Sequence, residues 1–329
     1  MNIRKRSLLG MAFGLAAATC LTPIAFAAEG TVVVYSAHKQ SIIDLLLPLF
    51  EAETGLKAEV IKMGSGDIAR RARAEADAPA ADVIWSIAGS QLTANADLLE
   101  AYTPADFDKV DPQFIQNPNW TPYTAVVYVL AVNTDILSVE DAPKTWSALA
   151  DPQWKGQIAS ARANGSGSAL QQLQTVLTLF GENGWQQYAD ISANYVFTDS
   201  SGAVPRYVAD GETSMGVTLE DNALTYVKGG APMAILHMTD GTPATPDGVA
   251  LVKNGPNPDG AKVFIDWVMS ASTQTILTTD IGRRSVRLDM AGPPGTPNLS
   301  DLNTMTPLPL SEFGGVEAVL AKWQEVTGN

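Results

Sequence analysis

Short β-branched runs alternate with helix-period segments along the first hundred residues, and this alternation most restricts the fold. Residues 31–35 form an apolar, β-branched run that is typical of a buried strand. A segment with apolar residues at helical spacing follows, and Gly55 ends it as a C-terminal glycine does. Further strands are expected at 58–61 and 82–85, with a charged helix over 64–75 between them. This order predicts an α/β lobe with a mainly parallel sheet.

A long apolar run at 123–132 separates the first lobe from a second α/β lobe. It is too long and too apolar for a surface loop, so we predict a strand that crosses between two lobes, with the chain returning at 249–252. The other expected elements are strands at 157–159, 214–218 and 234–236, and helices after residue 168, over 260–270 and over 317–326. Roughly 300 residues suffice for two cores. We assign 28–125 and 242–290 to lobe 1, and 126–241 and 291–329 to lobe 2.

The N-terminus has the organisation of a secretory signal peptide. Arg4, Lys5 and Arg6 precede an apolar stretch that ends in the small-x-small sequence at 25–27. The alternatives are an uncleaved anchor and lipid attachment at Cys20, but Thr19 before the cysteine makes a poor lipobox. We predict cleavage near Ala27 and export to the periplasm. The mature chain would then hold no cysteine and could form no disulfide.

The chain is acidic, with a formal net charge of −14. This charge disfavours nucleic acid and anionic membranes as partners, but helix N-termini can still bind a small anion locally. The sequence lacks the GxSxG, Walker, HExxH and CxxC motifs, and it has two histidines in all. We therefore expect no enzyme activity, no metal site and no cofactor.

Three serine- and glycine-rich clusters stand between an expected strand and the next helix, at 64–66, 165–168 and 200–202. In open α/β sheets, ligands gather at the carboxyl ends of strands, where helix N-termini offer free N–H groups. Serine is also a common helix cap and glycine a common turn residue, so for each cluster alone local structure is the favoured explanation. Together they predict a pocket for an oxyanion, formed by Ser65, Ser166, Gly167, Ser168 and Ser201.

Other candidate ligand-binding residues occupy similar positions at strand ends; they are Ser36, His38, Ser86, Thr218, Glu220 and Asp221. Glu220 and Asp221 either favour the dipole of a helix that begins there or accept hydrogen bonds from a ligand. Trp85 is either a stacking surface or a core residue, and His237 is expected in the core. The basic cluster Arg283, Arg284 and Arg287 either faces an anion, lies on a solvated face, or forms ion pairs, and the last two alternatives are favoured.

The mature chain resembles the type 2 periplasmic solute-binding proteins, in the branch of ferric-iron, hexose-phosphate and 2-aminoethylphosphonate binders. The resemblance rests on ordered motifs at 34–38, 50–55, 81–85, 151–156, 208–212, 226–232 and 246–248. It implies two α/β lobes, crossing hinge strands, and an interlobe cleft that closes on a ligand. It further implies a monomeric partner of an ABC permease in the inner membrane.

Iron-binding relatives in this branch combine a histidine, a glutamate and a tyrosine pair. Here His38 matches, but Ile87 stands at the glutamate position, and Asp221 and Asn222 occupy the tyrosine region. The resemblance therefore implies a small phosphorylated or phosphonate organic anion as the ligand. The serine and glycine clusters would hold the oxyanion, and Glu220 or Asp221 would hold the polar end. Ferric iron, or phosphoester chemistry by a Ser36–His38 pair, are the alternatives.

Overall fold

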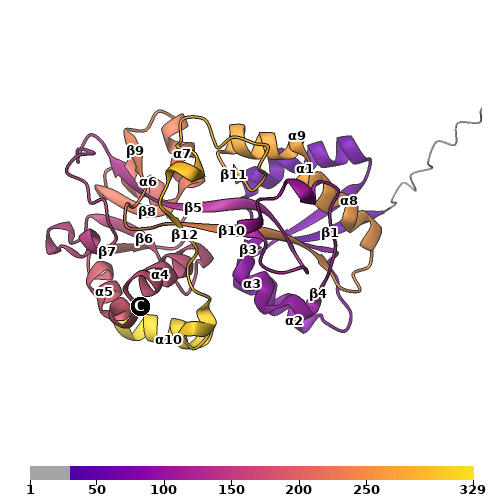
Figure 1. Cartoon of the computed structure of the whole chain (residues 1–329), viewed down its shortest axis with the longest axis horizontal. Coiled ribbons are helices and arrows are strands. Elements are labelled where there is room, and N and C mark those ends of the chain that lie inside the picture. Colours follow the sequence, from indigo (N-terminus) through magenta and orange to yellow (C-terminus); the bar gives the residue numbers. More distant parts are fainter. Residues whose placement is uncertain (1–29) are drawn as a thin grey trace, which may run out of the picture.

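The computed structural model describes residues 30–329; the predicted signal peptide and its cleavage site lie outside the described residues. Within that range the chain forms a mixed α/β structure with two lobes (Figure 1). One continuous path of strands, in the order β2-β1-β3-β10-β5-β8-β6-β7, runs through both lobes. The predicted α/β fold with two lobes is confirmed.

The first lobe is built on the parallel strands β1, β2 and β3, with β1 between the other two. The helices that directly follow these three strands begin close to their carboxyl ends. The elements are β1 (Thr31–Ser36), α1 (Gln40–Thr54), β2 (Lys57–Lys62), α2 (Ser65–Ala74), β3 (Val83–Ala88), α3 (Gly89–Ala94), β4 (Leu99–Glu100), α8 (Pro258–Met269) and α9 (Ala271–Ile276). Gly55 follows α1 with φ 75°, the left-handed conformation that ends a helix.

The second lobe repeats the pattern around β6, which pairs in parallel with both β7 and β8. Its elements are β6 (Ile158–Ala161), α4 (Gly167–Phe180), α5 (Gly184–Ser192), β7 (Tyr195–Thr198), α6 (Val204–Ala209), β8 (Met215–Leu219), α7 (Glu220–Lys228), β9 (Met233–Leu236) and α10 (Val316–Thr327). Because β6 and β8 are followed by α4 and α7, those helices also begin at strand carboxyl ends.

Two long strands join the lobes. β5 (Thr121–Asn133) is buried along its whole length; its first half pairs with β10 (Thr242–Val252) and its second half with β8 and β9. β10 in turn pairs with β3 of the first lobe. The short strands β11 (Arg284–Ser285) and β12 (Thr304–Met305) attach to β5 and β10. The predicted crossing strand and the return strand are therefore both present.

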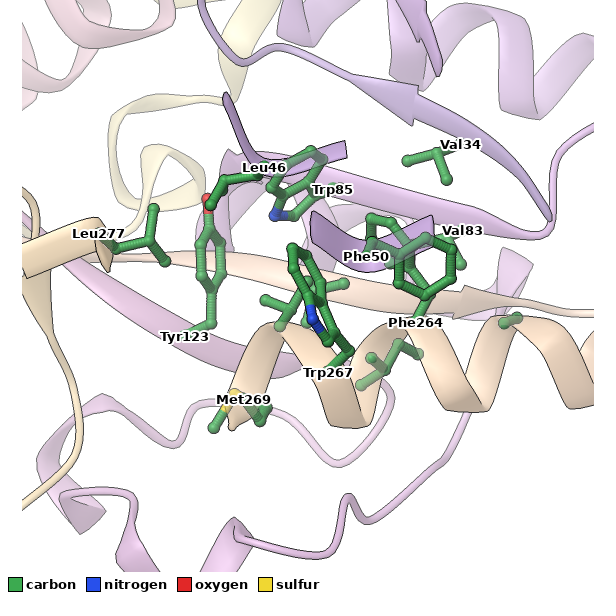
Figure 2. Close-up of a cluster of buried hydrophobic side chains, with 14 of the residues drawn as sticks. Val34, Leu46, Phe50, Val83, Trp85, Tyr123, Phe264, Trp267, Met269 and Leu277 are labelled. Atoms are coloured by element: carbon green, nitrogen blue, oxygen red, sulfur yellow. The ribbon is translucent and has the colours of Figure 1, made fainter. Parts of the chain in front are cut away.

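Each lobe has its own apolar core. In the first lobe, Phe50 packs edge to face on Phe264 and Trp267, with ring centroids 5.0 and 5.4 Å apart, and the rings of Phe264 and Trp267 are tilted at 6.1 Å (Figure 2). Trp85 belongs to the same cluster and is 1% exposed, so the core interpretation of this residue is confirmed. The second core gathers around α4 and the tail helix α10. Within residues 30–329, no helix is long and apolar enough to cross a membrane.

Candidate functional site

Two β-bulges meet at the point where β10 passes between the lobes. The register with β3 shifts between Gly248 and Val249, which leaves Ser86 unpaired, and the register with β5 shifts between Asp247 and Gly248, which leaves Tyr123 unpaired. Ser86 has φ 64°, a left-handed conformation that is costly for any residue with a side chain. Bulges redirect side chains. Here the Ser86 hydroxyl donates to Asp247 at 3.2 Å.

The guanidinium of Arg283 occupies the centre of this group. It donates to Asp247 at 2.9 Å and to the Ser86 hydroxyl at 3.4 Å, and lies 3.2 Å from Nδ1 of His38. Arg283 is 7% exposed and its Nε has no partner. Burial raises the pKa of the Asp247 carboxyl, and the attraction of Arg283 does not fully cancel that effect. The site thus holds a buried cation, and its Nε–H group donates to no acceptor within residues 30–329.

His38 is locked as a neutral ring. Burial and the nearby charges of Arg283 and Lys39 lower its pKa well below the usual value. Because arginine can only donate, Nδ1 accepts from Arg283, and the ring proton on Nε2 faces the Tyr123 oxygen at 2.7 Å. Ser36 accepts from the backbone N–H of His38, not from the ring. Both ring nitrogens are therefore occupied, and the Ser36–His38 pair is not arranged as nucleophile and base.

Glu220 opens α7 and is fully occupied by protein partners. Arg284 donates two hydrogen bonds to its carboxylate at 2.6 and 3.0 Å, and Nε2 of His237 lies 2.7 Å away. Burial raises the pKa of Glu220, but the hydrogen bonds of His237 and Arg284 outweigh it and leave that pKa below its usual value. His237 is half-buried just after β9, so the prediction that it lies in the core is wrong, but its ring is satisfied by a carboxylate.

Asp221, the next residue, faces the other lobe. Its carboxylate lies 3.6 Å from the ammonium of Lys39, which precedes α1 of the first lobe. Burial raises the pKa of Asp221, and the charges of Lys39 and Arg283 more than offset this, so the carboxyl stays ionised. The ion pair is longer than a hydrogen bond, and Lys39 is 38% exposed. Of the two acids, Asp221 is the one with acceptor capacity left for a ligand.

The serine and glycine clusters converge from both lobes. Ser65 is the first residue of α2 and Gly167 the first of α4, and a Cβ placed on Gly167 would lie 3.6 Å from the Ser65 hydroxyl. Ser166 caps α4 by accepting from the Ala169 N–H, with Ser168 half-buried in the first turn. These turns face one another across the lobe boundary.

The third cluster, at residues 200–202, makes hydrogen bonds within the second lobe. The carbonyl of Ser201 accepts from the Thr218 hydroxyl at 2.7 Å and from the Asn222 amide at 3.1 Å. Thr218 is fully buried, so its hydroxyl serves this internal contact. The Oδ1 atom of Asn222 is buried without a partner. Asn222 therefore has an acceptor that the protein does not use.

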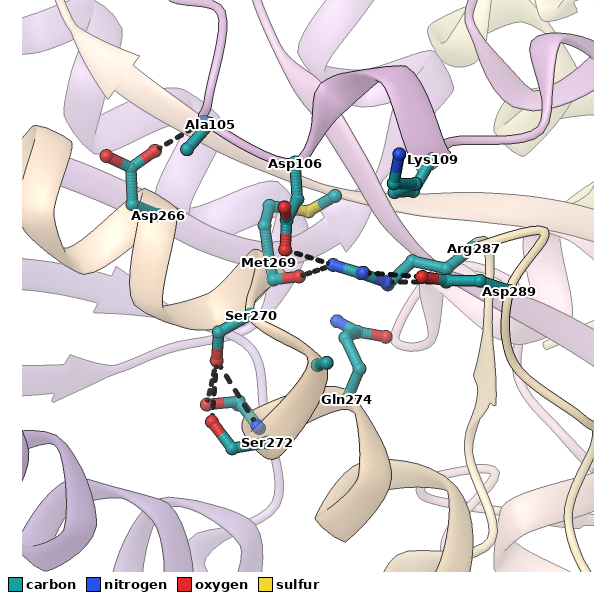
Figure 3. Close-up of polar contacts among 12 residues, drawn as sticks. Ala105, Asp106, Lys109, Asp266, Met269, Ser270, Ser272, Gln274, Arg287 and Asp289 are labelled. Carbon is teal, nitrogen blue, oxygen red and sulfur yellow. Dashed lines mark hydrogen bonds and ion pairs between the residues drawn. The ribbon is translucent and has the colours of Figure 1, made fainter.

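The basic cluster near the tail is buried, so the prediction of a solvated face is wrong and the prediction of ion pairs is confirmed. Arg283, Arg284 and Arg287 are 7%, 2% and 5% exposed. Arg287 lies apart from the other two, bonded to Asp106, Asp289 and the Met269 carbonyl (Figure 3). It fixes the segment that presents Arg283 and Arg284 to the lobe boundary.

Sequence reasoning missed four residues of this group: Lys39, Tyr123, Tyr128 and Asp247. Tyr128 is buried on β5; burial, with the nearby charge of Asp247, raises its pKa. The Asp247 signal was visible, because a Pro-Asp-Gly sequence within a crossing strand is unusual for a regular ladder. The Lys39 contact had no local signal, since its partner is 182 positions away (221 − 39).

Two α/β lobes, two crossing strands and converging charged residues are the architecture of a type 2 periplasmic binding protein. The family profile of bacterial extracellular solute-binding proteins matches residues 49–304. The chain is 30% identical over 263 residues to an uncharacterized protein of Haemophilus influenzae, covering 76% of this chain and 75% of that one.

Solved structures agree on the fold. The periplasmic binding protein AfuA of Actinobacillus pleuropneumoniae, with fructose 6-phosphate bound, superposes with a TM-score of 0.81 at 24% identity, over 91% of this chain and 99% of that chain. Iron-bound HitA of Pseudomonas aeruginosa gives a TM-score of 0.80 at 24% identity, with the same coverage. The chain belongs to the bacterial extracellular solute-binding protein family. It is a periplasmic solute-binding component of an ABC importer.

Proposed function

We propose that the protein captures a small phosphorylated or phosphonate organic anion by closing its lobes on it. The approach of the α2 and α4 N-termini, at Ser65 and Gly167, carries this proposal. Each helix N-terminus carries a partial positive charge and unpaired N–H groups. Two such ends that face each other repel, and an oxyanion beside them removes the repulsion while accepting hydrogen bonds from both lobes. α4 has no acidic residue in its first turn to neutralise its end.

The polar end of the solute is assigned to Asp221. Glu220 already accepts from Arg284 and lies against His237, whereas Asp221 has one long ion pair with Lys39. A hydroxyl or ammonium group of the solute would give Asp221 the short hydrogen bond that Lys39 does not supply. Arg283, whose charge also acts on Asp221, adds positive charge to the lobe boundary. The closed form would then dock on the cognate permease in the inner membrane.

Ferric iron is the competing solute, because the similar HitA structure is iron-bound. Within residues 30–329, no group of three or more His, Cys, Asp and Glu side chains is placed to hold a metal ion. His38 has both ring nitrogens occupied, and Asp221 and Asn222 stand where the resemblance implies a tyrosine pair. These contacts favour the organic anion.

The experiment is titration calorimetry with fructose 6-phosphate, 2-aminoethylphosphonate, inorganic phosphate and ferric citrate. Heat with an organic phosphate or phosphonate, and none with ferric citrate, is the expected result; the reverse refutes the proposal. Ser166→Asp is the decisive variant, because aspartate caps a helix as well as serine but places a negative charge at the α4 N-terminus. Binding should be lost with the melting temperature unchanged. Ser270→Asp, the same change at the cap of α9, is the control and should bind normally.

A further inference from the structure

Helix α4 buries three glutamine side chains, and they do not all serve the same lobe. Gln172 lies 3.3 Å from the Ser160 hydroxyl, whose proton it accepts, and Gln174 donates to the Leu308 carbonyl, both inside the second lobe. Gln171, by contrast, donates across the lobe boundary to the hydroxyl of Ser90 on α3, at 3.1 Å. Gln171 is 5% exposed. An amide buried this deeply needs a partner, because an unpaired one costs about 1–3 kcal/mol.

Both ends of this contact are held rigidly by their own lobes. On the first lobe, the Trp120 indole packs against the start of α3 so closely that a Cβ on Gly89 would lie 2.4 Å from it. Trp120 also donates to Thr93 of α3 at 3.0 Å. On the second lobe, Leu170 and Leu173 anchor α4 in the core on either side of Gln171. Neither side chain can follow the other if the lobes separate.

We propose that Gln171 and Ser90 form an interlobe latch that sets the fraction of closed protein and thus the retention of solute, without contacting the solute. The inference rests on the lobe closure of the proposed function, not on the chemistry of the solute. The latch joins α3 to α4, whereas the Lys39–Asp221 pair joins the residue before α1 to the start of α7. The two contacts thus hold the boundary at different places. When the lobes part, water replaces each partner.

A cysteine pair can report closure without any solute. A Cβ on Gly167 would lie 3.8 Å from the Cβ of Ser65, which is the usual Cβ separation in a disulfide. In a Cys20→Ser background the chain has no other cysteine. The rate at which Ser65→Cys/Gly167→Cys forms its disulfide under a fixed oxidant, followed on non-reducing gels, is therefore proportional to the closed fraction.

Adding Gln171→Ala to this background should slow disulfide formation by up to about fivefold, because one net hydrogen bond changes the closed-to-open ratio by about that factor. Ser90→Ala should slow it equally, the double variant no further, and Ser90→Thr, which keeps the hydroxyl, should restore the rate. Gln174→Ala is the control: it removes a hydrogen bond inside the second lobe, so it should lower the melting temperature and leave the rate unchanged. Equal rates with and without Gln171, or additive effects of the two alanine variants, overturn the latch. Because no solute is present, failure of the phosphate proposal would not affect this outcome.

Discussion

The strained backbone of Ser86 yields the sharpest prediction, because its magnitude follows from the conformation alone. Within residues 30–329, Ser86 and Asn254 are the non-glycine residues with positive φ. The left-handed conformation costs a residue with a Cβ roughly 1–2 kcal/mol. Glycine avoids that cost but loses about 0.4–1 kcal/mol more conformational freedom on folding than alanine does. Ser86→Gly should therefore be more stable to unfolding than Ser86→Ala by ~1 kcal/mol.

The comparison isolates strain, because both variants lose the same hydroxyl. Its bonds to Asp247 and Arg283 vanish in each, while the Arg283–Asp247 ion pair at 2.9 Å remains. Urea denaturation followed by tryptophan fluorescence measures the difference. Ser36, a buried strand residue with ordinary φ, provides the control pair, and there alanine should be more stable than glycine. If Ser86→Ala proves as stable as Ser86→Gly, the bulge is not strained and this account of it is wrong.

Two further predictions concern buried charge. Arg284→Met should lower the free energy of unfolding by about 3–5 kcal/mol, since it leaves the Glu220 carboxylate buried without its bidentate partner; a chemical denaturation curve that shifts by less than 1 kcal/mol would contradict the assigned pair. His38 has a pKa well below its unfolded value, so only the unfolded chain takes up its proton near pH 6.5, and stability must fall as pH falls through that value. Relative to His38→Gln, the wild type should lose about 2 kcal/mol of stability between pH 7 and pH 5, measured by urea midpoints at each pH; parallel profiles would show that the ring is not held neutral.

The amino-acid sequence by itself determined the parts of this protein that depend on neighbours along the chain. The alternation of apolar runs placed β1, α1 and β2, the glycine at 55 ended its helix, and Ser166 capped α4 as the spacing indicated. The length and apolarity of the 123–132 run identified the crossing strand. These features follow from local periodicity and capping, which a sequence displays directly.

Tertiary structure alone decided which residues of the site contact one another. Ser86 and Asp247 meet across 161 positions, and they do so only because two register shifts place both beside Arg283. Glu220 and Asp221 are adjacent acids with the same local pattern, yet one is occupied by Arg284 and the other faces Lys39. No propensity distinguishes them, because their roles are set by which distant cation packs against each. Likewise, only the packing shows that Arg283 and Arg284 of the basic cluster are buried at the lobe boundary, while Arg287 is buried apart from them.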